Sequence, residues 1–447
     1  MEMIYGIKDR PGFGKVLLFA LQQLLAIMAA TIAVPAIVGH GLTASAALFG
    51  AGVGTFVYLL FTKSSSPVFL GSSFAFIGSM FSAFGGAASV AVGYWGLIIG
   101  AVMAGLVYVA IAIAVKCCGV NWIDRLMPPV IIGPTVSIIG LSLSSNAIGD
   151  LMKSSVEGGS TYVALICGLV TLAVTMLCSN YGKKIGRLIP FILGILAGYL
   201  AASAFALIGH LTSNPALVII NYSALLEVKS FFSVPKFTFV LGGIEGLKSI
   251  TPAYLLTVFA AYVPVAFVVF AEHLADHKNL SAIVGVDLLK TPGLTRTLLG
   301  DGVGTIISTA FGGCPNTTYG ESIGCVAITR NASTVSIWGC ALLCILFSLI
   351  SPLVAFLETI PNCVMGGVCI TLYGFIAVSG FKMFQKVDLN STKNLFVASV
   401  IFITGVGGMV LKIGAVEIRT VACALILGIL TNLMLSGKTE SEGSQEN

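Results

Sequence analysis

The chain has 447 residues, of which 57% are hydrophobic and only 9% are charged. Soluble domains carry about 25% charged residues, so this composition excludes a soluble protein and indicates a polytopic protein of the lipid bilayer. We attribute the net charge of +5 to basic cytoplasmic loops and expect no binding of nucleic acid. The eleven cysteines show no repeated C-x-x-C spacing. We expect them to be small buried side chains that form neither disulfides nor a zinc site.

Fourteen apolar segments approach the length of about 20 residues that crosses a bilayer. In chain order they are 16–38, 46–62, 67–85, 94–115, 124–147, 159–178, 188–208, 249–275, 297–312, 314–329, 334–356, 362–381, 393–412 and 418–436. The third and the tenth are short and interrupted by glycine. Seven spans per half would place the second half upside down relative to the first, which is the inverted-repeat architecture of secondary carriers.

The basic residues predict the orientation of the chain. They precede the first predicted span and recur mainly in alternate loops: Lys8, Arg10, Lys15, Lys63, Lys116, Arg125, Lys183, Lys184, Arg187, Lys278, Lys290, Arg296, Arg330, Lys382, Lys386 and Lys438. The positive-inside rule then places both termini in the cytoplasm. The loop that contains Lys412, Glu417 and Arg419 fits this pattern less well. We expect the long connection 209–248 to face outside and the polar tail 438–447 to be disordered.

One polar stretch, residues 314–330, stands out in this apolar sequence. It is broken by a proline and two glycines, and it carries Glu321 at membrane depth. A carboxylate there costs about 2.5–3.5 kcal/mol on insertion scales, so it indicates a functional site. The alternative is a short loop outside the membrane in which Glu321 is solvated. Residues 72–76 (SSFAF) repeat the pattern of residues 317–321 (TTYGE) in the other half. Paired broken segments of this kind predict a transporter binding site.

A second acidic segment ends the eighth predicted span. Glu272 and Asp276 are four residues apart and share one helix face, and His273 and His277 share another. Two interpretations compete, a metal site and a protonation site. Because a low-dielectric environment disfavours an ionised carboxyl group, Glu272 can load and release a proton, and we favour this interpretation. For His277 and Lys278, a solvated loop is the better interpretation.

Other polar residues carry weaker signals. Gln22, Gln23 and Tyr373 lie inside apolar runs, where a hydrogen-bonded core residue is more common than a ligand. We expect Asp301, near the start of the ninth predicted span, to be structural.

These motifs resemble the nucleobase–ascorbate transporter family, and within it the bacterial uracil permease branch. The resemblance covers residues 10–434 and is carried by PNTTYGESIGCVAITR, AEHLADHKNL, LGSSFAFI and LQQLLAIMAATIAVP. The family signature is an acid or amide, then x-x-Gly, four residues and Thr-Arg, and Glu321, Gly324, Thr329 and Arg330 match it. Related purine carriers typically have glutamine at the position of Glu321, so the glutamate favours a pyrimidine.

The resemblance implies an all-α polytopic fold of about 14 spans in two inverted seven-span repeats. Short antiparallel β-strands in spans 3 and 10 would face each other at the midplane. A core domain would comprise residues 1–116 and 249–357, and a gate domain residues 117–248 and 358–437. The family also implies frequent homodimers.

The resemblance further implies a proton-coupled symporter that imports uracil across the cytoplasmic membrane by alternating access. It implies no enzyme activity and no cofactor beyond the proton gradient. The substrate would contact the carboxylates of Glu272 and Glu321 and the backbone N–H groups of Phe74 and Gly320, with Ala30, Tyr319 and Tyr373 lining the pocket. Glu272 and Asp276 would carry the proton.

Three positions depart from the pattern of the family. Close relatives often have histidine at Asp276, and many members have asparagine at Ser322 and histidine at Gln23. We expect Asp276 to alter the proton relay without abolishing it, and the other two residues to affect fine substrate choice.

The chemistry of the residues agrees with this resemblance. Uracil alternates N–H donors with C=O acceptors, and two carboxylates can accept its N–H groups in charge-assisted hydrogen bonds. We expect one of the two, Glu272, to be protonated during turnover. The rival functions are a xanthine or guanine permease, an anion carrier of the sulfate or bicarbonate type, a membrane metalloenzyme that uses Glu272 with His273 and His277, and a channel. An anion carrier would use arginine or free helix N-termini without acids, and no filter motif indicates a channel.

Overall fold

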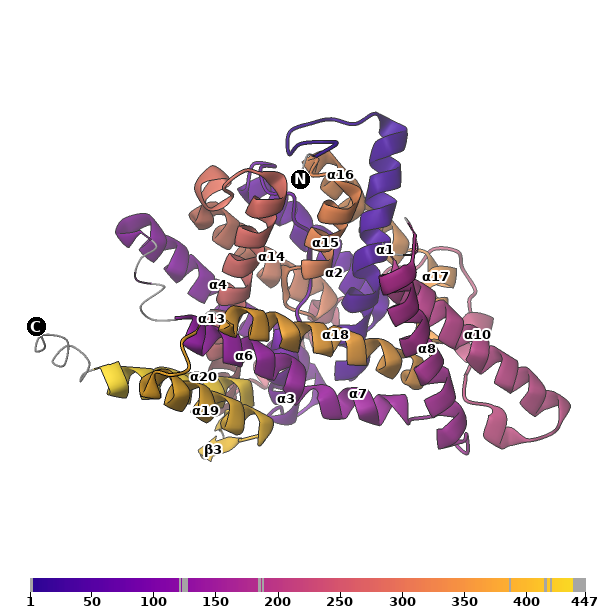
Figure 1. Ribbon diagram of the computed structural model, residues 1–447. Helices are drawn as coiled ribbons and strands as arrows, with labels where there is room; N and C mark the ends of the chain where they lie inside the picture. Colours follow the sequence, from indigo (N-terminus) through magenta and orange to yellow (C-terminus); the bar gives the residue numbers. More distant parts are fainter. Residues whose placement is uncertain are drawn as a thin grey trace, which may run out of the picture.

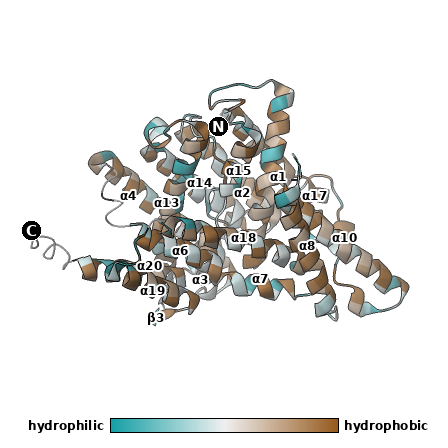
Figure 2. Ribbon diagram, viewed as in Figure 1, coloured by the Kyte–Doolittle hydropathy of each residue, from teal (hydrophilic) through white to brown (hydrophobic). Residues whose placement is uncertain are grey.

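The computed structural model describes residues 3–436 apart from 120, 121, 123–127, 184, 185, 187, 188, 386, 414, 415 and 419. The polar tail and the first residues of the fifth predicted span therefore lie outside the described residues. Figure 1 shows a mostly helical molecule in which helices cross at many angles. Apolar residues dominate most of these helices (Figure 2).

The first half of the chain contains α1 (Phe13–Val38), α2 (Ala44–Phe61), β1 (Leu70–Ser72), η1 (Phe74–Phe76), α3 (Ile77–Gly85), α4 (Val90–Cys118), α6 (Pro129–Ser142), α7 (Ser144–Leu151), α8 (Thr161–Tyr181) and α10 (Pro190–Leu211). The second half contains η2 (Pro215–Leu217), α11 (Ser223–Leu226), α12 (Thr238–Lys248), α13 (Pro252–Val284), η3 (Leu289–Gly293), α14 (Leu294–Gly312), β2 (Asn316–Thr318), α15 (Gly320–Thr329), α16 (Thr334–Ser348), α17 (Ser351–Glu358), α18 (Asn362–Phe384), α19 (Thr392–Val406), β3 (Leu411–Ile413), β4 (Val416–Ile418) and α20 (Thr420–Leu435).

Eight helical stretches of the described chain are long and apolar enough to cross a membrane. They are α1, α2, α4, α6 with α7, α8, α10, α13 and α18. Four shorter apolar helices, α3 with η1, α16, α19 and α20, lie at other predicted spans. A chain with this many apolar helices is a multi-pass membrane protein. The count of fourteen stays a prediction, because it depends on the shorter elements.

Some predicted boundaries are wrong. The eighth predicted span ends at residue 275, but α13 continues to Val284, so the acidic segment lies inside a helix. The eleventh predicted span is two helices. The first, α16, ends at Ser348, and the second, α17, begins at Ser351 with Pro352 in its first turn, where proline is favoured. The long connection includes α12, and the β3–β4 hairpin was not predicted.

The two broken segments meet as predicted. Strand β1 pairs antiparallel with β2, with Leu70 opposite Thr318 and Ser72 opposite Asn316. The Ser73 N–H extends the pairing by donating to the carbonyl of Pro315 over 2.8 Å. The expected short strands in spans 3 and 10 are therefore confirmed, and each leads directly into a helical segment, η1 or α15.

The helices pack in two groups. In the first, α14 packs against α2 and α4, α16 packs against α1 and α2, and α13 packs against α4. In the second, α18 packs against α6, α7 and α8, α10 packs against α8, and α19 packs against α6 and α20. The strand pair belongs to the first group, where β1 contacts α2 and β2 contacts α14. Helix α13 also contacts α6 and α20, so it lies where the two groups meet.

The N-terminal segment is bound to the link between α15 and α16. The Ile4 N–H donates to the carbonyl of Arg330 over 2.8 Å, and the Tyr5 carbonyl accepts from the Ala332 N–H over 2.8 Å. Arg330 itself has a positive φ of 54°. Figure 1 shows the N terminus beside α16.

Replacement of Gly71 by alanine tests the close packing at the strand pair. A Cβ atom at Gly71 would collide with the ring of Tyr319, and overpacking of this kind costs about 1–3 kcal/mol. We expect a lower unfolding temperature in detergent and reduced transport. The control is Gly374→Ala, because a Cβ atom there meets nothing within 4 Å. If the two variants unfold at the same temperature, the strand pair tolerates the extra methyl group.

Candidate substrate-binding site

Two adjoining cavities lie between α13 and α15 on one side and α6 and α18 on the other. The larger, which we call the carboxylate cavity, has a volume of about 350 Å³. The smaller, which we call the strand-crossing cavity, has a volume of about 50 Å³. The residues that line both are Glu272, Gly320, Glu321, Leu372 and Ile376. The two packing groups of helices therefore both contribute to these cavities.

The carboxylate cavity brings together the three predicted acidic residues. Glu272 and Asp276 come from successive turns of α13, and Glu321 comes from the first turn of α15. The Thr318 hydroxyl donates to Asp276 Oδ2 over 2.6 Å, which holds this carboxyl group against β2. No Lys, Arg or His is among the described residues that line the cavity. The site therefore offers hydrogen-bond acceptors with no basic side chain to neutralise them.

The strand-crossing cavity lies where η1 and α15 begin. Ser73, Phe74, Thr318, Tyr319 and Gly320 line it. The first N–H groups of a helix have no partner within the helix, so this cavity offers donors beside the acceptors of Glu272 and Glu321. The Tyr319 hydroxyl donates to the Ser72 carbonyl over 2.7 Å, which fixes the aromatic ring next to Gly320.

Two predicted lining residues lie elsewhere. Neither Ala30 nor Tyr373 is among the described residues that line these two cavities. Ala26, one turn before Ala30 on α1, lines the carboxylate cavity instead. The Tyr373 ring packs edge-on against Phe74 with centroids 5.7 Å apart. In this structure Tyr373 therefore supports the site through Phe74.

A buried polar network lies behind the acidic residues. His273 Nδ1 lies 2.7 Å from Asp301 Oδ2, and His273 Nε2 lies 3.0 Å from the Thr297 hydroxyl. His277 Nε2 lies 2.8 Å from the Tyr58 hydroxyl. The expectation of a solvated His277 is wrong, because its side chain is fully buried in the helix that continues past it. The interpretation of Asp301 as merely structural missed its buried pairing with His273, for which the sequence gives no local signal.

The same contacts argue against a metal site. Both ring nitrogens of His273 are occupied, and His277 Nδ1 lies 2.8 Å from the His273 carbonyl oxygen while its Nε2 faces Tyr58. Within the described ranges no group of three His, Cys, Asp or Glu side chains could hold a metal ion. The histidines therefore position α13 against α2 and α14.

Two of the three departures from the family pattern contact each other. The Gln23 side-chain amide donates to the Ser322 hydroxyl, which in turn accepts from the Phe69 N–H over 3.1 Å. Gln23 comes from α1 and Ser322 follows Glu321 on α15. The bond therefore fixes the first turn of α15 against α1 and the segment that enters β1.

A carboxyl-lined cavity at the crossing of two broken membrane segments defines a membrane transporter and not an enzyme. Comparisons with known proteins agree. Residues 14–414 match the xanthine–uracil Permease family, and the chain belongs to this family.

Several similar curated proteins are uracil permeases. The uracil permease of Bacillus subtilis (strain 168) is 38% identical, and the alignment covers 98% of this chain and 96% of that protein. The uracil permease of Escherichia coli (strain K12) is 37% identical, with 96% and 93% covered. The resemblance to the uracil permease branch is thus confirmed over nearly the whole chain.

Solved structures share the fold. The transmembrane domain of the cyanobacterial bicarbonate transporter BicA matches with a TM-score of 0.62 at 15% identity, covering 96% of this chain and all of that domain. The SLC26A9 structure matches with a TM-score of 0.65 at 14% identity, and the match covers 94% of this chain and 64% of that protein. At these identities the likeness shows the fold alone.

The Asp301→Asn variant tests the buried network. If His273 and Asp301 are paired as ions, removing one charge costs about 3–5 kcal/mol, because the other group is left without its partner. We expect a marked fall in thermal stability in detergent, with partial recovery in the double variant Asp301→Asn/His273→Gln. The control is Asp287→Asn, since Asp287 is exposed, pairs with the exposed Lys290 and accepts a hydrogen bond from the Leu289 N–H. Equal stability of the two single variants would mean that the His273–Asp301 contact carries no charge.

Proposed function

We propose that the protein is a proton-coupled symporter that imports uracil across the cell membrane by alternating access. One observation carries this proposal: a cavity that adjoins two helix starts is lined by three carboxyl groups and, among the described residues, by no basic side chain. Relatives that share 37–39% of the sequence are uracil permeases. No cofactor is required beyond the proton gradient.

The hydrogen-bonding pattern of the site supports uracil as the substrate. Its N–H groups would donate to Glu272 and Glu321, and its carbonyl groups would accept from the backbone N–H groups of Phe74 and Gly320. Charge-assisted hydrogen bonds of this kind are roughly twice as strong as neutral ones. Leu372, Ile376 and the Tyr319 ring would cover the faces of the planar base, while Ala30 and Tyr373 would act from behind this layer.

The crowding of acids supports coupling to protons. Unpaired charges in a low-dielectric site are costly, and the described lining of the carboxylate cavity has no cation to offset them. A proton on Glu272 would relieve this cost when the base binds beside Glu321. Asp276, held by Thr318, would exchange the proton with Glu272 one turn away.

The packing of the helices supports two moving bodies. The group around α14 would be the core domain, which carries the strand pair, and the group around α18 would be the gate domain. The carboxylate cavity reaches Ile328 and Met383, close to Arg330 and Lys382, which the positive-inside rule assigns to the cytoplasm. The structure would then be inward-facing, with both termini in the cytoplasm, and a homodimer would form through the gate domains.

Glu321→Ala removes a proposed substrate ligand. Loss of a hydrogen bond to a charged group costs about 1.5–3 kcal/mol, so we expect the Kd for labelled uracil to rise roughly tenfold to hundredfold. The control is Glu245→Ala, because Glu245 is exposed on α12. An unchanged Kd in Glu321→Ala would remove Glu321 from the site.

Glu272→Gln keeps the shape of the side chain but cannot take up a proton. In proteoliposomes with an imposed inward proton gradient, we expect wild-type protein to accumulate labelled uracil and this variant to lose accumulation. Exchange of uracil between equal pools needs no net proton movement, so we expect the variant to retain it. Normal gradient-driven accumulation in Glu272→Gln would contradict the proton role. Competition by xanthine as effective as that by uracil would instead indicate a purine permease.

A further inference from the structure

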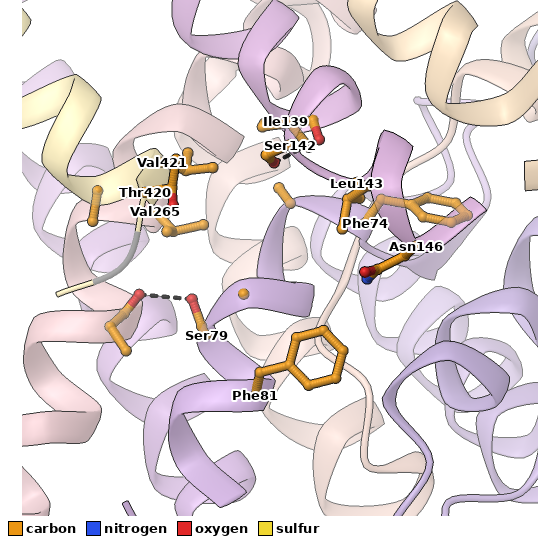
Figure 3. Close-up of a pocket in the computed structure, with 14 residues that line it drawn as sticks. Phe74, Ser79, Phe81, Ile139, Ser142, Leu143, Asn146, Val265, Thr420 and Val421 are labelled. Atoms are coloured by element: carbon orange, nitrogen blue, oxygen red, sulfur yellow. Dashed lines mark hydrogen bonds between the residues drawn. The ribbon is translucent and has the colours of Figure 1, made fainter. Parts of the chain in front are cut away.

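A third cavity, which none of the three acidic residues lines, adjoins Phe74 (Figure 3). Its volume is about 190 Å³. Phe74, Ala75 and Ile139 line both this cavity and the strand-crossing cavity, so they form the wall between the two. The remaining lining comes from α3, α6, α7, α13 and the start of α20. The third cavity therefore lies between the same two packing groups as the carboxylate cavity.

The walls of the third cavity are mostly apolar, and no charged residue is among the described residues that line it. Figure 3 shows Phe74, Phe81 and Leu143 around one part of it. The exceptions are a few neutral polar groups. The Ser79 hydroxyl is already bound, since it donates to the Ala261 carbonyl over 2.6 Å.

Asn146 on α7 is a polar residue free to bind a ligand. Its side-chain amide lines the cavity and makes no hydrogen bond with the described part of the chain. A carboxamide offers one acceptor and two donors side by side. These groups match an adjacent N–H and C=O on the edge of a flat heterocycle. An apolar cavity with few well-placed polar groups is typical of small-molecule sites, and the lack of charge disfavours an ion.

We propose that the third cavity is a second binding site for the transported base, which reaches it before passing Phe74 to the carboxyl groups. The ligand is a small, neutral, planar heterocycle with an imide or amide edge. This inference rests on the proposed function, because it assigns both cavities to one substrate. It predicts two sites of different chemistry in one chain, one that depends on acids and one that depends on an amide.

Equilibrium binding of labelled uracil to the purified full-length protein in lipid nanodiscs tests this inference. We expect wild-type protein to bind two molecules per chain. Glu321→Ala should retain one molecule, bound in the third cavity. Asn146→Leu should also retain one, now bound at the carboxyl groups and lost when Glu321→Ala is added.

A second variant removes the site by filling it. Gly78 lines the cavity, and a Cβ atom there meets nothing within 4 Å, so Gly78→Leu should place its side chain in the cavity without disturbing the fold. We expect it to bind one molecule, as Asn146→Leu does. The matched control is Asn180→Leu, since Asn180 is an exposed residue of α8 outside these cavities, and it should bind two.

The possible results separate the two proposals. One molecule per wild-type chain, lost in Glu321→Ala, would overturn the second site and leave the proposed function standing. Two molecules that persist in both Asn146→Leu and Gly78→Leu would place the second site elsewhere and also overturn the inference. If folded wild-type protein binds no uracil, the proposed function fails, and the inference fails with it.

Discussion

The pairing of β1 with β2 is the interaction on which the site depends. Two segments from opposite halves of the chain leave the helical conformation inside a membrane protein, where an unpaired backbone group costs several kcal/mol. The two segments pair their backbone groups with each other at three residue pairs, and the hydrogen bond from the Ser73 N–H to the Pro315 carbonyl extends this pairing. This pairing fixes where η1 and α15 begin. It thereby brings the start of each helix, and the carboxyl group of Glu321, to one place.

Around this crossing, helices α13, α1, α18 and α6 each position one part of the site. Helix α13 supplies Glu272 and Asp276, and its histidines are bound to α2 and α14 on the side away from the cavity. Helix α1 fixes α15 through the contact of Gln23 with Ser322. The first packing group thus supplies all three acids, while α18 and α6 of the second group supply a mostly apolar wall. Such a division is what the proposed alternating access would need, because the polar part of the site would then move with one group of helices and the other group would cover or expose it.

The sequence was informative where the signal is local. Glycine and proline in an apolar run, with an acid at membrane depth, predicted the broken segment 314–330. The repeat of its pattern at residues 72–76 predicted the other, and the pairing of the two is confirmed. The partners of His273 and His277 could not be predicted, because Asp301 is 28 residues away and Tyr58 is 219 residues away. The same buried contacts extend α13 beyond its predicted end. Ala26 and Ala30 are one turn apart and share a face of α1. Which of them lines the cavity therefore depends on the position of α1 along its own axis, which the apolar sequence of the helix does not reveal.

The N-terminal segment has a practical consequence. Residues 4 and 5 are hydrogen-bonded to residues 330 and 332, which directly follow the helix that carries Glu321. An affinity tag or fusion protein attached at the N terminus would therefore pull on the end of α15, whereas α20, the last helix of the described chain, packs against α19, α6 and α13. An affinity tag for purification is therefore better placed after α20 than before residue 4. Conversely, a fluorophore attached near residue 4 would report movements of α15 without any label inside the cavity.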